Sequence, residues 1–359
     1  MSKKVWRRSA VGKALILGAL LTVAVPATAY ANTVAVTVKT PGATSGPTTI
    51  DSEISTHADC GSGLISGGGV DQAIGTGSSA NGNHVMGSAP SPDGTTEYTG
   101  STGVVGTDVT HWLGIGGTGG MLNSSFSTTP YAVCFTSNLI NHTQVVMNKV
   151  NAPTTASTVG LVTATCPANT VLLGGGARTT PASVGNFKAI ASFPTFNNAA
   201  HDFGKKAAAD GETNPDSWTA VGWDAGTGNS INETYAYAIC SGSGINVSGV
   251  TVKARYSEVS GPTTGSTGQT ATVGCGTGDG NLVSGGAAIS GGSVTTTDFT
   301  GPGSGGDHLN GSFPSDSAGN PVTDGTTTAA YWTAFAHTGG QASAGTHSDV
   351  WALCANDGI

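Results

Sequence analysis

Charged residues are scarce in this sequence: Asp, Glu, Lys and Arg make up 9 % of its 359 residues, where an ordinary globular domain has about 25 %. Basic residues are the scarcer kind, with 13 against 21 acidic ones. The first 31 residues hold five of the basic residues and no acidic one, so eight basic residues face 21 acidic ones in the rest of the chain, a net charge of −13. A protein without a basic face cannot recruit phosphate groups. The sequence therefore argues against nucleic acid or an anionic membrane surface as partner.

Long apolar runs are absent after residue 31. The one earlier run, residues 14–25, follows a basic start and precedes Ala29-Tyr30-Ala31, the order of a secretory signal with cleavage after Ala31. That run is shorter than the roughly 20 apolar residues a spanning helix needs. We therefore expect a signal peptide over residues 1–31 and a secreted, extracellular protein of bacterial type without a membrane span.

Motifs of known catalytic or nucleotide sites are also missing. The sequence has no Gly-x-Ser-x-Gly element and no zinc-type histidine cluster, and its glycine clusters lack the Lys-Ser/Thr of a phosphate loop. Glycine is nevertheless abundant, 57 residues in all. We interpret the clusters as sites of β-bulges or of close backbone approach, and we expect a non-catalytic protein.

Three sets of motifs recur with fixed spacing. A Pro-Thr-Thr triplet precedes a cysteine by 13 residues three times, and a tryptophan precedes a second cysteine by 22 residues three times. Between them lie a glycine cluster and a Ser-x-Pro triplet, at variable distances. Fixed spacing is typical of strands, because a one-residue slip turns every side chain to the other face. The pattern predicts three homologous tandem units, residues 32–139, 140–245 and 246–359.

The six cysteines are expected to form one disulfide within each unit. Two cysteines per unit select one of the 15 possible pairings, and an exported chain meets an oxidising compartment. No two cysteines are close enough in sequence for the usual zinc pair. The predicted bridges are Cys60–Cys134, Cys166–Cys240 and Cys275–Cys354.

Short apolar and β-branched runs bounded by Gly, Pro, Asn and Ser predict an all-β protein. The clearest runs are residues 33–39, 144–150, 159–165, 188–192, 218–223, 234–240, 250–256 and 331–336. Only residues 198–212 are expected to hold a turn or two of helix. The units are closely joined, so two architectures stay open: one compact body with pseudo-threefold symmetry, or three small sandwiches in a row.

Aromatic residues divide into repeated and unrepeated ones. Trp112, Trp218 and Trp332 recur at a fixed distance from a cysteine, which predicts buried core positions. Aromatic residues found in one unit only are the better ligand candidates, although ordinary packing is the favoured role for them too. These candidates are Trp223, Tyr98, Tyr235 and His111.

Oxygen-bearing side chains alternate along one acidic loop, and oxygen atoms are the ligands that Ca²⁺ prefers. An acidic solvated loop is the favoured interpretation, because the pattern departs from known calcium loops and occurs once. The candidate ligands are Asp210, Glu212, Asn214 and Asp216.

The leading hypothesis from these patterns is a secreted binding or surface-structural protein, with a polysaccharide or another cell-surface polymer as partner. Self-assembly is a further hypothesis, and a secreted hydrolase acting on a polymer such as polysaccharide is the alternative. Recognition is expected on loops, which commonly carry function. The loops of variable length are residues 71–83, 91–108, 177–187, 195–216, 288–311 and 315–330.

Overall fold

The computed structural model describes residues 31–73, 82–121, 125–180, 187–226, 231–341 and 344–358. All but the last residue of the predicted signal peptide lies outside them. The described chain is all-β, as predicted, and its one helical element is the short 3₁₀ segment η2 (Ala199–Gly204). In the described part, no helix is both long and apolar enough to cross a membrane.

Strands β1 to β8 belong to the first predicted unit, β9 to β14 to the second and β15 to β20 to the third; these stretches are called the first, second and third segments below. Their bounds are β1 (Ala35–Lys39), β2 (Thr44–Ser45), β3 (Glu53–Asp59), β4 (Leu64–Ala73), β5 (Asn83–Ser91), β6 (Gly103–Thr107), β7 (His111–Thr118), β8 (Ser127–Thr136), β9 (Thr143–Asn151), β10 (Thr158–Thr165), β11 (Leu172–Thr180), β12 (Phe187–Thr195), β13 (Ser217–Asp224), β14 (Glu233–Ser241), β15 (Thr251–Ser260), β16 (Gly268–Gly274), β17 (Asn281–Ser290), β18 (His308–Ser315), β19 (Tyr331–His337) and β20 (His347–Asn356).

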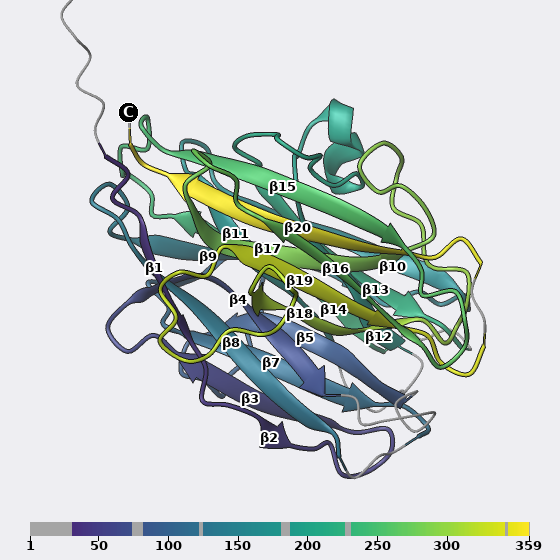
Figure 1. The fold of residues 1–359 in the computed structure, drawn as a ribbon. Helices are drawn as coiled ribbons and strands as arrows, with labels where there is room; N and C mark the ends of the chain where they lie inside the picture. Colours follow the sequence, from purple (N-terminus) through teal and green to yellow (C-terminus); the bar gives the residue numbers. More distant parts are fainter. Residues whose placement is uncertain are drawn as a thin grey trace, which may run out of the picture.

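The strands form three sheets (Figure 1). Sheet I has the order β1-β8-β4-β18-β19-β16, with β2 also paired to β8. Sheet II has the order β3-β7-β5-β11-β14-β9-β6, and sheet III the order β10-β13-β12-β17-β20-β15. Neighbouring strands are antiparallel throughout these pairings, for example β4 with β8 and β5 with β7.

Each sheet joins strands of two segments. Strand β5 of the first segment pairs with β11 of the second, β12 of the second pairs with β17 of the third, and β18 of the third pairs with β4 of the first. The segments are therefore linked in a closed ring. The chain ends meet in the same way, because Thr33 Oγ1 donates a hydrogen bond to Asp357 at 2.5 Å and β1 and β20 begin and end at one side of the molecule (Figure 1).

The core lies where the three sheets meet, and its largest side chains include the recurring tryptophans. Trp112, Trp218 and Trp332 are fully buried, as predicted. Each packs on a glycine of a glycine-rich strand so closely that a Cβ there would fall 2.2–2.4 Å from the indole; the glycines are Gly68, Gly175 and Gly285. Each of these strands also has a β-bulge against its closing strand. The glycine clusters thus serve bulges and close approach, as the sequence indicated.

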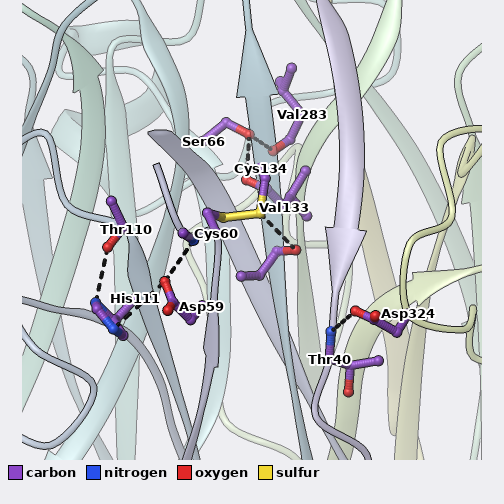
Figure 2. The surroundings of a disulfide bond; sticks show 12 residues. Thr40, Asp59, Cys60, Ser66, Thr110, His111, Val133, Cys134, Val283 and Asp324 are labelled. Atoms are coloured by element: carbon purple, nitrogen blue, oxygen red, sulfur yellow. Dashed lines mark hydrogen bonds and ion pairs between the residues drawn. A yellow bond between two sulfur atoms is a disulfide. The ribbon is translucent and has the colours of Figure 1, made fainter. Parts of the chain in front are cut away.

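The three disulfides are those predicted: Cys60–Cys134, Cys166–Cys240 and Cys275–Cys354. In each, the first cysteine directly follows an edge strand and the second lies in the closing strand of the same segment, in another sheet. Figure 2 shows the first of them, between the end of β3 and β8. The bridges therefore connect sheet I with II, II with III, and III with I.

Three loops of variable length cover strands that would otherwise be sheet edges. Within residues 91–108, β6 pairs with β9. Within residues 195–216, the carbonyls of Glu212 and Val252 accept hydrogen bonds from Ala254 N and Asn214 N, which lays this loop along β15. Within residues 315–330, Val38 N in β1 donates to the Thr326 carbonyl at 2.8 Å. Unpaired strand edges can pair with other chains. By covering such edges, these loops make that pairing less favourable.

Candidate functional site

Trp223 is a packing residue. It lies in β13 with 2 % of its surface exposed, and the ammonium group of Lys188 lies 5.5 Å from the centre of its ring. Burial lowers the pKa of Lys188 to about 8. The face of the indole is thus occupied by a cation of the protein itself, in line with the favoured interpretation.

Tyr235, in β14 of sheet II, and Tyr98, in the 91–108 loop, both contact Tyr237. Tyr235 is buried in β14 and its hydroxyl donates to Glu233, while the hydroxyl of Tyr237 donates to the Tyr98 carbonyl at 2.8 Å. Tyr235 and the neighbour of Tyr98, Glu97, line a surface hollow of about 450 Å³. The tertiary structure therefore brings two of the four aromatic candidates toward one place.

Three of the residues that line this hollow, Arg178, Glu53 and Glu97, form an ion triad centred on the buried Arg178. The Arg178 guanidinium donates to the carboxylates of Glu53 and Glu97 at 2.7–3.0 Å, and its Nη1 also donates to the Thr179 carbonyl at 2.8 Å. All five of its N–H groups have a partner. The triad joins β11 to β3 and to the 91–108 loop, and it leaves Arg178 no donor for a ligand.

His111 lies beside the first disulfide (Figure 2). Its Nδ1 is 3.0 Å from Thr110 Oγ1 and its Nε2 is 3.6 Å from Asp59 Oδ1. A surface hollow of about 600 Å³ is present here, but its lining includes His57, Asp59 and Asp324 rather than His111. The imidazole of His111 is held by its neighbours at the side of this hollow.

The four oxygen residues proposed as Ca²⁺ ligands hydrogen-bond to protein groups. Asp210 accepts from Tyr256 N, Glu212 from Ala209 N, Asn214 from Val252 N and Asp216 from Asn197 N, at 2.7–3.0 Å. Among the residues that the structure describes, no group of three or more His, Cys, Asp or Glu side chains is placed to hold a metal ion. The arrangement fixes the 195–216 loop against β15, and Ca²⁺ binding stays a prediction.

A pair of acids of the kind a hydrolase uses lies beside Tyr256 of β15. The hydroxyl of Tyr256 is 2.7 Å from Asp349 Oδ1 and 2.8 Å from Glu258 Oε2. Burial raises the pKa of Asp349 to about 7, the direction that suits a general acid. Asp349 is nevertheless fully buried, so a polymer cannot reach it.

A surface hollow of about 550 Å³ lies between β9, β10 and the loop around η2. Phe203 projects at its edge with 61 % of its surface exposed. Half-buried Val150 and Leu161 add apolar surface together with Val162. Amide, hydroxyl and charged side chains complete the lining: Asn148, Lys149, Thr163, Thr165, Asn197, Asp202 and Lys205. Most of the described lining is therefore polar, and Phe203 is its one aromatic ring.

The backbone that presents Phe203 is strained. Asp202 and Phe203 both adopt left-handed conformations, with φ of 44° and 54°. This conformation costs a non-glycine residue about 1–2 kcal/mol and is unusual for a bulky one. Strain of this kind persists only where the surroundings enforce it, and it concentrates at functional sites.

The surroundings do enforce the conformation. Phe203 N donates to the Asn198 carbonyl at 2.8 Å, and Thr219 Oγ1 donates to the Gly204 carbonyl at 2.8 Å. Gly204 has φ +98° and lies so close to β10 that a Cβ would fall 2.2 Å from Thr163 Oγ1, so only glycine fits there. The backbone that presents the exposed ring is therefore fixed before any ligand arrives.

Sequence reasoning identified residues 195–216 as a recognition loop but did not single out Phe203. The available signal was an aromatic residue between Asp202 and Gly204 in a loop of variable length. Exposure of that ring depends on the left-handed turn, which no local sequence pattern specifies.

No protein-family model matches this chain, and no curated protein matches it either. The functional assignment therefore depends on the chemistry of the hollow itself.

Proposed function

We propose that this is a secreted carbohydrate-binding protein, and that the hollow beside Phe203 is its polysaccharide-binding site. The observation that carries the proposal is an aromatic ring, 61 % exposed, held in a strained left-handed turn above a hollow with amide and hydroxyl groups. A sugar ring has one apolar face of C–H groups and a rim of hydroxyls. The apolar face would pack on the Phe203 ring, while Asn197 and Lys205 would contact the rim.

An uncharged polysaccharide suits this site best. Lys205 Nζ is 2.9 Å from Asp202 Oδ2, and Lys149 Nζ is 3.0 Å from Glu233 Oε1. The cations at the hollow are therefore paired with acids of this chain, and no excess charge is left to select an ionic polymer. The buried position of Asp349 gives the alternative of a hydrolase no support.

Secretion belongs to the same proposal. Three disulfides fit an oxidising, extracellular compartment, and the basic and apolar N-terminal residues have the order of an export signal.

We also infer that the three segments are copies of one unit around a pseudo-threefold axis. The inference is supported by the closed ring of β5–β11, β12–β17 and β18–β4 pairs, and by a bulge at the same step of the three glycine-rich strands. In this arrangement the three segments have a common set of strands, and the η2 loop occurs in the second segment. The protein would then carry one Phe203 site per chain.

Binding to insoluble polysaccharides and to a glycan array tests the carbohydrate proposal. Phe203→Ala should weaken binding at least tenfold, about 1.4 kcal/mol, and Phe203→Trp should preserve it. Ile50→Ala is a matched control, because Ile50 is another exposed apolar residue, 55 % exposed and outside the hollow. Unchanged binding by Phe203→Ala, or no binding of the wild-type protein to any glycan, would refute the proposal.

A further inference from the structure

A small, partly enclosed cavity of about 20 Å³ lies where the three sheets meet, with Ser192 and Ser312 half-buried in its wall. Its wall has contributions from every segment. Three serines in it, Ser88, Ser192 and Ser312, come from the three Ser-x-Pro triplets. They pair directly across the joins between segments with three further wall residues, Ala177, Ala287 and Val70.

Each serine hydroxyl accepts a hydrogen bond from a tryptophan. The distances from indole Nε1 to serine Oγ are 2.9 Å for Trp112 and Ser88, 2.8 Å for Trp218 and Ser192, and 2.9 Å for Trp332 and Ser312. A serine hydroxyl has one proton to donate and a second lone pair. Within the described part of the chain, no protein acceptor is found for these three protons. Three hydroxyl groups with unused capacity thus line one cavity.

The size and chemistry of the cavity select a small neutral occupant. About 10–15 Å³ of such volume is enough for one water molecule. Apart from the serines, the wall consists of glycine and aliphatic side chains, with no charged residue. An ion there would lose its hydration without a counter-charge, which is costly.

We propose that this cavity is a binding site for one structural water molecule shared by the three segments. The water accepts hydrogen bonds from two of the serine hydroxyls and donates one to the oxygen of the third, whose own proton is left without a protein acceptor. Three bonds are typical of a buried water. The site is independent of the Phe203 hollow and connects the three inner strands β5, β12 and β18 at the centre of the ring.

A high-resolution crystal structure of the wild-type protein, grown with and without bromide, tests the site directly. The expected result is one spherical density peak within hydrogen-bond distance of all three serine Oγ atoms, without anomalous signal from bromide. A bromide peak would overturn the proposal in favour of an anion site. Xenon binding in the cavity under pressure would overturn it in favour of a dry apolar cavity.

The Ala177→Val variant gives a second readout, in which a rise of the melting temperature is the decisive result. Valine already stands in this wall as Val70, so the side chain suits the strand. If a water occupies the cavity, the extra methyl groups displace it and deprive the serines of a partner, so the melting temperature should fall by about 2–4 °C. If the cavity is dry, the same methyl groups fill it and the melting temperature should rise, which would contradict the proposal.

Discussion

Replacing Arg178 by methionine is expected to destabilise the fold strongly, because it removes the centre of a buried ion triad. The Arg178 side chain is 3 % exposed, while those of Glu53 and Glu97 are 26 % and 23 % exposed. Breaking a buried ion pair by removing one partner costs about 3–5 kcal/mol. Since both carboxylates are about a quarter exposed and can recover some hydration, we expect the lower end of that range, about 3 kcal/mol.

The assay is urea denaturation of the oxidised protein at pH 7, with the free energy of unfolding extrapolated to water. Lys205→Met is the matched control. It removes a cation that also pairs with two carboxylates, Asp202 and Asp298, but with 53 % of its side chain exposed. An exposed pair contributes about 0–1 kcal/mol. The triple variant with Glu53→Gln and Glu97→Gln should recover part of the loss, because no uncompensated charge remains. A cost below about 1 kcal/mol for Arg178→Met would refute the reasoning, since the triad would then contribute no more than a surface pair.

Two further predictions follow from the core. Burial raises the pKa of Asp349 to about 7, so the folded state holds a proton that the unfolded state releases near the ordinary pKa of 3.8. The free energy of unfolding should therefore fall as pH rises from about 4 to about 7. Asp349→Asn should flatten this dependence in urea midpoints measured from pH 4 to 8. A steeper or unchanged slope in the variant would contradict the assignment. Gly175→Ala should lower the free energy of unfolding by about 1–3 kcal/mol in the same assay, because the new Cβ would fall 2.3 Å from Trp218. Gly292→Ala should be nearly neutral, because no atom lies within 4 Å of its new Cβ. Equal effects of the two glycine substitutions would show that close packing under the indole is not the reason for glycine.

The covering loops change how the variable regions of the sequence are understood. Parts of residues 91–108, 195–216 and 315–330 pair with the opening strand of another segment, so their first task is to close a sheet edge. Only the parts of these loops that do not contact the covered strand remain available to a partner. The turn at Phe203 is such a portion, which explains why recognition is proposed for one part of one loop.

The strands and the core could be predicted from the sequence because disulfides and buried tryptophans require residues at fixed spacing. A disulfide requires two cysteines at compatible positions, and a buried indole beside a glycine-rich strand requires the same register each time it occurs. The invariant intervals from proline to Cys60 and from Trp112 to Cys134, repeated in the other segments, therefore predicted the pairing and the burial.

The sequence alone determined the all-β class, the three disulfides and the buried tryptophans, since each follows from composition or from a spacing repeated along the chain. Only the tertiary structure decided which segments share a sheet, which loops cover an edge, and that Arg178 binds Glu97 and Glu53 across 81 and 125 residues of sequence. These contacts join residues with no pattern between them. They arise because the three segments close into a ring, and ring closure is a property of packing rather than of any local stretch of residues.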